Sequence, residues 1–594
     1  MTKIDLKKAE DNYFRGNLGA VYSPEKTLFR FWQPFAEKAF LRLYNTENVR
    51  ILFEKMHRNK SVFELEVRGD LAGFEYDFAV FDNGEFREFA DSYSRAVNQN
   101  ATRGIVVDMR KNAPSGWETD KPIAAENPVI YELSVRDFSM DESADFTARG
   151  KFLAFCEYNV KNSHGEICGL EYIKNLGATH IQFMPVFDFD SDGSSYNWGY
   201  NPRFFNAPSN NYSQNNAVLE LRKLVLSAHK KGLGVVVDVV YNHVFDAGKS
   251  SFERQIPGYF FRGNGGFSNG SGCGNEFASE RKMARKFILD SVEFLAREYH
   301  FDGFRFDLMG LLDIKTVREI ERRLRRINPS ILLYGEGWTG GESALSERFR
   351  AVQRNARRLT GIAFFNDSFR DAIRGNVFNI HERGFVSGAV EQFEPIKRAL
   401  SGKYPRDFWT ENPVQTINYA ECHDNHTLYD RLKISLKKAG ARRFMRAEKM
   451  AAALILLSSG IAFLHAGQEF LRTKNGAENS YNLPDEINSI KWNKLSENSA
   501  LSAYYRGLIA FRKRYLDELC GGDFSEINGG FLMKNEQFLL IINPTNKKIT
   551  LNSDEKYEIF VDENFASDSA IYTKKRLCCA EYSVLLARRT TDEK

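Results

Sequence analysis

The stretch Gly303-Phe-Arg-Phe-Asp-Leu-Met-Gly310 decides the fold assignment. Apolar residues alternate there with Arg305 and Asp307, and this alternation is typical of a β-strand. An ionisable pair at the C-terminal end of such a strand has no packing use, so we interpret both residues as functional. A second strand of the same kind is predicted at 331–338, and it carries Glu336 between two glycines.

Similar strands recur through residues 126–512. Eight candidates, separated by amphipathic helices, begin at about residues 129, 180, 234, 303, 331, 361, 414 and 461. Apolar strands that alternate with helices predict a parallel sheet covered on both faces. The count favours a (β/α)₈ TIM barrel over a doubly wound sheet. No Gly-x-Gly-x-x-Gly follows the first strand, which also argues against a dinucleotide fold.

Two regions with shorter alternating runs flank the predicted barrel. Residues 13–112 contain runs bounded by Pro, Asn and Gly, and we predict a β-sandwich there. Trp32 lies inside one of these runs, where we expect a core residue rather than a platform for sugar. Residues 515–588 predict a second β-sandwich. The expected fold is therefore multidomain, with a central barrel at 126–512, in keeping with a length of 594 residues.

Charge and cysteine usage exclude several classes of protein. Lys plus Arg number 82 and Asp plus Glu 78, without a basic run, so nucleic acid is not expected as a partner. Seven scattered cysteines without a Cys-x-x-Cys pair argue against a disulfide framework or a zinc site and favour a reducing compartment. The N-terminus has no apolar signal region, so we expect a cytoplasmic location.

The apolar run 450–467 is long enough to raise the question of a membrane span. Ser458, Ser459 and Gly460 interrupt it and divide it into a helical half and a strand half. We therefore expect a soluble protein without a membrane partner.

Polar side chains cluster just past the predicted barrel strands. They are Asn242 and His243 after the third strand, Arg305 and Asp307 at the fourth, Glu336 at the fifth, and residues 421–426 after the seventh. Active sites of (β/α)₈ barrels lie at the C-terminal ends of the strands. Four polar strand ends on one face therefore predict an active site.

Two carboxylates on successive strands are the parts of a retaining glycosidase, in which they lie about 5–5.5 Å apart. Asp307 suits the nucleophile because Arg305, on the same strand face, favours its ionised form. Glu336 suits the general acid if burial or nearby negative charge keeps it protonated. Asp424, beside His423, is placed to bind substrate hydroxyls and to raise the pKa of Glu336.

Four segments together resemble the ordered sequence regions of the α-amylase family, glycoside hydrolase family 13. They are Asp238-Val-Val-Tyr-Asn-His243, Gly303-Phe-Arg-Phe-Asp307, Gly335-Glu336 and His423-Asp424. The segment Tyr196-Asn-Trp-Gly-Tyr-Asn-Pro202 further resembles the signature heptapeptide of type I pullulanases, which debranch α-1,6 linkages. The resemblance extends over about residues 13–588, and its N-terminal part is similar to carbohydrate-binding module family 48.

The resemblance implies a role for each matching residue. Asp307 corresponds to the nucleophile, Glu336 to the acid/base, and Asp424 to the third carboxylate, which distorts and holds the sugar at subsite −1. Binding roles around that subsite are implied for His243, Arg305, His423 and the stacking residue Tyr200, and Trp338 lies where the family lines the acceptor side. Asp238 is expected to hold Arg305 in place.

The implied reaction is hydrolysis, with retention, of α-1,6 branch linkages in pullulan, limit dextrins or branched oligosaccharides derived from glycogen. It requires no cofactor, although the resemblance allows a structural calcium ion near Asn242 or nearby acidic loops. Alternatives in the same family are an isoamylase-like debrancher, a neopullulanase and a glycogen branching enzyme. An alternative from another class is an inactive glucan-binding scaffold, which the presence of all three carboxylates disfavours.

Two positions depart from the family pattern. Asn201 stands where the heptapeptide commonly has Asp, which affects subsite detail or a metal contact. Thr339 stands where an Asp usually follows Gly-Glu-Gly-Trp, which affects contacts to the acceptor. The sequence leaves the oligomeric state open.

Overall fold

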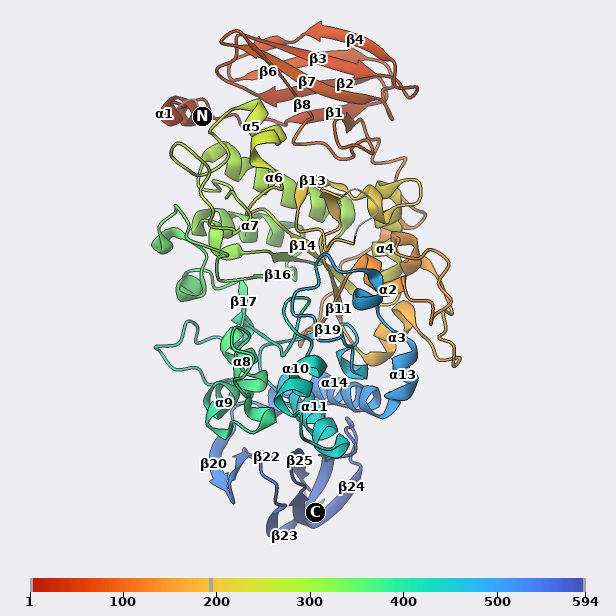
Figure 1. Cartoon of the computed structure of the whole chain (residues 1–594), viewed down its shortest axis with the longest axis vertical. Coiled ribbons are helices and arrows are strands. Elements are labelled where there is room, and N and C mark those ends of the chain that lie inside the picture. The colour runs from red at the N-terminus through yellow and green to blue at the C-terminus, as the bar shows by residue number, and fades with distance from the viewer. Residues whose placement is uncertain (1–3, 192–195, 591–594) are drawn as a thin grey trace.

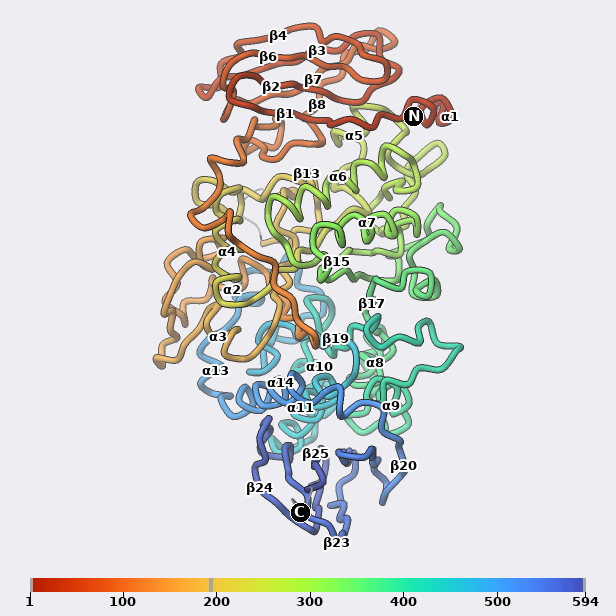
Figure 2. Tube along the Cα trace, turned by 180° about the vertical axis from the view of Figure 1, so that it is seen from behind, coloured from red at the N-terminus to blue at the C-terminus, as the bar shows by residue number. Residues whose placement is uncertain are grey.

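The computed structural model describes residues 4–191 and 196–590. Three domains are stacked along the long axis, with a β domain at each end and the barrel between them (Figures 1 and 2). This arrangement agrees with the predicted order of domains. The C-terminal domain, predicted as a second β-sandwich, is β-rich, with its six strands in one continuous order.

The N-terminal domain follows the short helix α1 (Leu6–Asp11) and is a sandwich of two antiparallel sheets. One sheet has the order β1 (Gly19–Ser23), β2 (Lys26–Trp32), β6 (Val62–Arg68), β5 (His57–Asn59). The other has the order β4 (Arg50–Lys55), β3 (Lys38–Tyr44), β7 (Glu75–Asp82), β8 (Glu85–Phe89), with β9 (Gly104–Ile105) also on β7. Phe31, Leu41 and Phe78 belong to the buried cluster of this domain.

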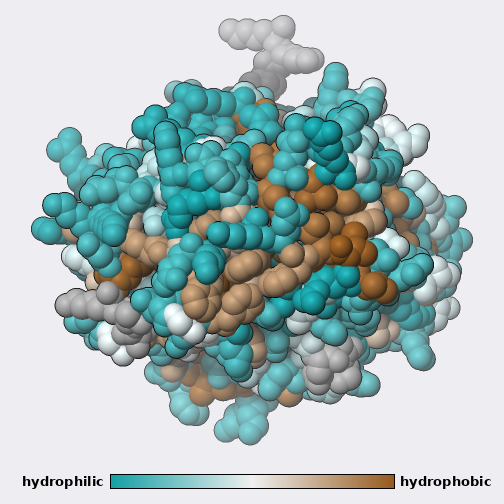
Figure 3. Space-filling view, turned by 90° about the horizontal axis from the view of Figure 1, so that it is seen from above, coloured by the Kyte–Doolittle hydropathy of each residue, from teal (hydrophilic) through white to brown (hydrophobic). Residues whose placement is uncertain are grey.

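The outer face of this domain carries exposed apolar side chains. Ile51 and Phe53 of β4 and Phe86 of β8 are each about half exposed. Seen from above, apolar residues gather in a band across the molecule (Figure 3). The aromatic residues of this domain therefore divide into a buried set and an exposed set.

Trp32 joins the sandwich to the barrel domain. Its side chain is 1% exposed, and its ring centroid lies 4.7 Å from that of Tyr259. Its indole N–H donates to the main-chain oxygen of Asn12 at 2.8 Å, and its own carbonyl accepts from the Gln255 side chain at 2.6 Å. The expected core role of Trp32 is confirmed, and the core in question spans two domains.

Eight parallel strands form a closed barrel in chain order, and the last pairs with the first. They are β10 (Val129–Leu133), β11 (His180–Phe183), β14 (Gly234–Val239), β15 (Gly303–Phe306), β16 (Leu332–Gly335), β17 (Ala363–Phe365), β18 (Thr416–Asn418) and β19 (Ile461–His465). Every strand predicted for the barrel is present. The barrel is a packed core, because Ile130, Val236 and Phe463 belong to one buried cluster.

Helices follow the strands and cover the barrel (Figure 1). They are α2 (Val135–Ser139), α3 (Gly169–Leu176), α4 (Ala217–Lys230), α5 (Ser251–Gln255), α6 (Lys282–Tyr299), α7 (Ile314–Ile327), α8 (Asp367–Arg374), α9 (Phe393–Ser401), α10 (Leu428–Ser435), α11 (Ala441–Leu456), α12 (Asp485–Asn488), α13 (Asn493–Glu497) and α14 (Ser499–Leu519). Side-chain caps fix the starts of several of them, as when Asn216 accepts from the Leu219 N–H of α4. No helix among the described residues is long and apolar enough to cross a lipid bilayer.

Two short strands interrupt the barrel pattern after β11. They are β12 (Phe187–Phe189) and β13 (Pro202–Pro208), which pair antiparallel. The heptapeptide 196–202 leads into β13, so this hairpin positions the segment on which the family resemblance partly rests.

The C-terminal domain has six antiparallel strands in one continuous order: β20 (Asp523–Ile527), β21 (Gly530–Lys534), β22 (Phe538–Asn543), β25 (Ser583–Arg589), β23 (Ile549–Val561) and β24 (Tyr572–Cys579). Alternate residues of β22 belong to different apolar clusters: Phe538 and Leu540 belong to the main core, whereas Leu539 and Ile541 belong to a separate one. All seven cysteines of the chain are unpaired.

Trp32→Ala should destabilise the protein by about 3–5 kcal/mol, because it removes a buried aromatic side chain from the domain interface. Thermal unfolding and limited proteolysis of the N-terminal domain would measure this. The matched control is Phe53→Ala, which removes an exposed ring of the same domain. Equal destabilisation by the two variants would contradict the proposed role of Trp32.

Candidate active site

The polar strand ends meet at one cavity of about 500 Å³ at the C-terminal end of the barrel. Five of the predicted site residues line it: Arg305, Glu336, Trp338, His423 and Asp424. The other three, Asp307, Tyr200 and His243, are joined to this group through the contacts described below. The structure therefore brings all eight predicted residues into one region.

Arg305 is the central cation of the site and is 2% exposed. Its Nη1 donates to both oxygens of Asp238, at 3.0 and 2.8 Å, and to Oδ1 of Asp307 at 2.9 Å. Its Nη2 forms an ion pair with Oε1 of Glu336 at 2.7 Å. One guanidinium thus orients both proposed catalytic carboxylates, and Asp238 holds the guanidinium as predicted.

Asn242 fixes the other oxygen of Asp307. Its amide N–H donates to Oδ2 of Asp307 at 2.7 Å and to the main-chain oxygen of Asp307 at 3.0 Å. Arg305 and Asn242 therefore hold the carboxylate from two sides, which gives it a single orientation.

Glu336 lies in surroundings that favour its protonated form. The pKa of Glu336 is raised from 4.5 to about 8, chiefly by burial; Asp307 and Asp424 contribute to the rise, and Arg305 opposes it. Its Oε2 accepts from the main-chain N–H of Leu308 at 2.8 Å. Leu308 has φ +38°, a left-handed conformation that is uncommon for a residue other than glycine. A carboxyl group that keeps its proton at neutral pH can act as a general acid.

His423 carries a positive charge beside the third carboxylate. Burial alone would lower its pKa, but Asp424 and Glu132 raise the pKa of His423 to about 9. Its Nδ1 lies 2.8 Å from Oε1 of Glu132, and its main-chain N–H donates to Oε2 of Glu132 at 2.7 Å. Its Nε2 lies 3.7 Å from Asp424. Glu132 therefore fixes the strand end that presents Asp424.

Tyr200 and His243 form the side of the site nearest the heptapeptide. The Tyr200 hydroxyl donates to Asp238 at 2.7 Å, and its ring is stacked on that of His423 with centroids 5.1 Å apart. His243 is buried, and its two ring nitrogens contact the Asn242 side chain at 2.7 Å and the Tyr200 carbonyl at 3.0 Å. Burial lowers the pKa of His243, so the ring is neutral and its visible role is to position Tyr200.

Sequence reasoning missed several residues of the cavity. Glu132 is the clearest case, and the available signal was an acidic residue within the otherwise apolar strand 129–133. Phe365, Arg370 and Phe378 also line the cavity. Phe378 is 91% exposed, and no periodicity in its segment marks it as functional.

The two departures from the family pattern have different surroundings. Thr339 lines the cavity beside Trp338. The main-chain oxygen of Asn201 accepts from the Asp190 N–H at 2.8 Å, but its side chain makes no hydrogen bond with described residues.

The calcium hypothesis gains no support, because residues 4–191 and 196–590 contain no group of three His, Cys, Asp or Glu side chains suited to a metal.

Comparison of the chain with family models and with known relatives shows the family to which it belongs. The model described as "Alpha amylase, catalytic domain" matches residues 158–257, and "Carbohydrate-binding module 48 (Isoamylase N-terminal domain)" matches residues 17–94. The pullulanase of Bacillus subtilis (strain 168) is 40% identical over 528 residues, which covers 85% of this chain and 72% of that protein. The chain belongs to the pullulanases of the α-amylase family.

Solved pullulanases share the whole fold of this family member. The pullulanase of Paenibacillus barengoltzii in complex with maltohexaose and alpha-cyclodextrin matches with a TM-score of 0.92 and 36% identity, covering 99% of this chain and 97% of that one. The pullulanase of Bacillus acidopullulyticus matches with a TM-score of 0.92 and 35% identity, covering 97% of this chain and 75% of that one. The predicted type I pullulanase resemblance is confirmed. This pullulanase is a glycoside hydrolase that acts on α-1,6 links, and its family needs no organic cofactor.

Glu336→Gln should stabilise this pullulanase relative to the wild type, and more so as the pH rises. The folded protein holds the Glu336 proton up to about pH 8, whereas 4.5 is the ordinary pKa of the group. The contribution of the Glu336 proton to the free energy of unfolding is thus fully present below pH 4.5. It is lost as the pH rises through 8, where the folded protein releases that proton. Because Gln does not titrate, the difference in Tm should grow between pH 5 and pH 9. A difference that is independent of pH would contradict the raised pKa.

Proposed function

We propose that this pullulanase cleaves α-1,6 branch linkages with retention, through a covalent glycosyl-enzyme on Asp307 and with Glu336 as acid/base. The observation that carries the proposal is the shared guanidinium of Arg305, which contacts one oxygen of each carboxylate. The raised pKa of Glu336 supplies the proton donor. Holding both carboxylates on one cation is compatible with the separation of about 5–5.5 Å expected for retention.

The steps follow from these roles. Glu336 gives its proton to the glycosidic oxygen, the bond from that oxygen to C1 breaks, and Asp307 forms a bond to C1. Glu336, now a carboxylate, removes a proton from water, which attacks C1 and releases Asp307. The sugar leaves with its original anomeric configuration, and both side chains return to their starting protonation states.

The surrounding residues hold the sugar during these steps. Asp424 and His423 face the cavity together and are suited to bind hydroxyl groups at subsite −1. Tyr200 supplies an aromatic ring there, and the His243 ring contacts the main-chain oxygen of Tyr200. Trp338 lines the acceptor side. The third carboxylate also favours retention of the Glu336 proton in the free enzyme.

The substrates we propose are pullulan, limit dextrins and branched oligosaccharides derived from glycogen. We further propose a cytoplasmic location, since seven unpaired cysteines suit a reducing compartment. An isoamylase-like debrancher, a neopullulanase and a glycogen branching enzyme are the alternatives within the family. They differ in the products they form, which makes product analysis the deciding experiment.

The enzyme should release maltotriose from pullulan and leave amylose intact, because it attacks the α-1,6 links. Asp307→Asn should reduce the rate at least about 10³-fold, since it removes the nucleophile. Product chromatography would measure both. Panose from pullulan, or cleavage of amylose, would reveal α-1,4 attack and favour the neopullulanase alternative. Glucan binding by the wild type without any turnover would favour the inactive scaffold.

Glu132→Gln should lower kcat/KM on pullulan about 10²-fold, because the loss of its charge displaces His423 and the strand end that carries Asp424. It should also lower the pKa of His423, which a proton NMR titration of the imidazole would measure. Glu469→Gln is the matched control, since Glu469 is a fully buried glutamate whose carboxylate contacts Tyr131 and Tyr172 instead. Unchanged kinetics in Glu132→Gln would refute its positioning role.

A further inference from the structure

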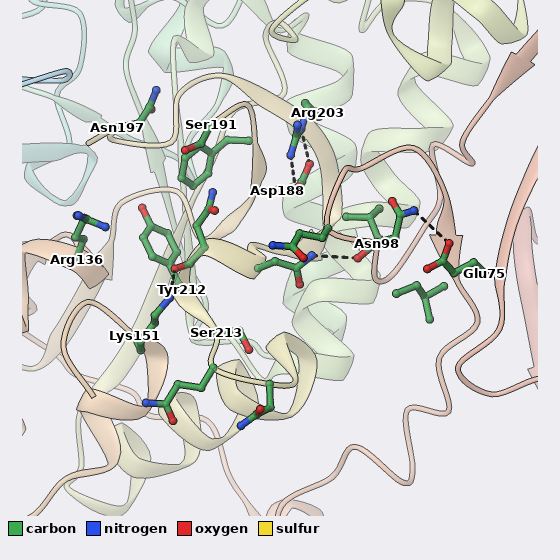
Figure 4. Close-up of a pocket in the computed structure, with 18 residues that line it drawn as sticks. Glu75, Asn98, Arg136, Lys151, Asp188, Ser191, Asn197, Arg203, Tyr212 and Ser213 are labelled. Atoms are coloured by element: carbon green, nitrogen blue, oxygen red, sulfur yellow. Dashed lines mark hydrogen bonds and ion pairs between the residues drawn. The ribbon is translucent and has the colours of Figure 1, made fainter. Parts of the chain in front are cut away.

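A second cavity, of about 630 Å³, lies where the N-terminal domain meets the barrel loops. Its volume is within the range of about 300–1,000 Å³ that is typical of ligand sites. It shares no lining residue with the active-site cavity. Figure 4 shows Arg136, Lys151 and Tyr212 of the barrel domain on one side and Asn98 and Glu75 of the N-terminal domain on the other.

The ionic groups of this cavity are mostly paired with one another. Arg203 makes two hydrogen bonds to Asp188, at 2.9 and 3.0 Å. Arg136 makes two to Asp485, both at 2.7 Å. Lys151 has no carboxylate partner among the described residues and donates to the main-chain oxygen of Asn211 at 2.8 Å. A single unpaired cation is a weak basis for an anion site.

Four neutral polar side chains, in contrast, are left without partners. The side chains of Gln99, Asn211, Ser213 and Gln214 line the cavity and make no hydrogen bond with described residues. The Ser213 hydroxyl is buried in this unpaired state. Amide groups both donate and accept, which matches the hydroxyl groups of a sugar. The cavity thus has hydrogen-bonding capacity suited to a neutral polyhydroxyl ligand.

The segment that carries Asn211, Ser213 and Gln214 is anchored by hydrogen bonds of its main chain. Glu220 of α4 is 3% exposed and accepts from the main-chain N–H groups of Gln214, Asn215 and Asn216 at 2.8–3.1 Å. The preceding 3₁₀ turn, Asn210–Tyr212, brings the buried Tyr212 ring to 5.7 Å from that of Phe189. The main chain that carries Asn211, Ser213 and Gln214 is therefore held in place before any ligand arrives, which reduces the entropy lost on binding.

We propose that this interdomain cavity is an accessory subsite for the α-1,4-linked glucan chain of a polymeric substrate. The inference rests on the proposed function, because it assigns the cavity to the same substrate. Asn197 lines the cavity and belongs to the segment 196–202, which also carries Tyr200 of the active site. A chain bound in the cavity would raise the local concentration of its branch point at Asp307.

The test compares a polymer with a substrate too short to reach both sites. Asn211→Ala/Gln214→Ala should raise KM for pullulan about fivefold or more without changing kcat, because two hydrogen-bonding groups are lost. KM for the branched pentasaccharide 6-O-α-maltosyl-maltotriose should stay unchanged. The matched control, Gln537→Ala/Asn546→Ala, removes two exposed amides of the C-terminal domain. It should behave as the wild type does on both substrates.

A rise in KM for both substrates, or for neither, would overturn the proposal. Gln214→Trp, at an exposed position, provides a second variant that should block the cavity without disturbing the core. If the wild type cleaves no pullulan, the proposed function fails but the cavity can still be tested. Calorimetric titration with maltohexaose should then detect a site that the double variant lacks, and equal binding by both proteins would overturn the subsite.

Discussion

The buried guanidinium of Arg305 is the interaction on which the active site depends. Three carboxylates, Asp238, Asp307 and Glu336, contact this one cation. Three buried anions around one cation would leave uncompensated negative charge, which is costly in a desolvated site. The raised pKa of Glu336 relieves that imbalance by keeping a proton on one acid. The proton that the proposed acid role of Glu336 requires therefore follows from burial and from the number of charges around Arg305.

Much of this arrangement could be predicted from local sequence. Most barrel strands lie in short apolar runs, and Asp307 and Glu336 lie where such runs end. Positions set by periodicity and strand order need no knowledge of distant contacts. The helical half predicted within the apolar run 450–467 began too late, since α11 begins at Ala441. Three arginines, Arg442, Arg443 and Arg446, lie in its first two turns, so the continuous apolar pattern starts well after the helix does.

The remaining features depend on contacts between distant parts of the chain. Glu132 meets His423 only because barrel closure places β10 next to β19 and near the end of β18. Nothing near residue 132 in the sequence indicates that partner. The interdomain cavity likewise needs the N-terminal sandwich to be seated on the barrel, a placement that Trp32 helps to fix. Sequence patterns assign elements and chemistry, whereas packing decides which of them share a site.

Packing also links the interdomain cavity to the active site through α2. The Tyr196 hydroxyl, at one end of the heptapeptide, donates to Asp137 of α2 at 2.5 Å, and Arg472 donates to the other oxygen of Asp137 at 2.8 Å. At the other end, Pro202 is paired with Phe189 in the β12–β13 hairpin. Arg136, the neighbour of Asp137, lines the cavity. Tyr200 is therefore carried by a segment fixed at both ends to elements of the cavity wall. If a glucan binds there as we propose, binding energy from remote parts of the chain can contribute to orienting the branch point at the proposed catalytic carboxylates.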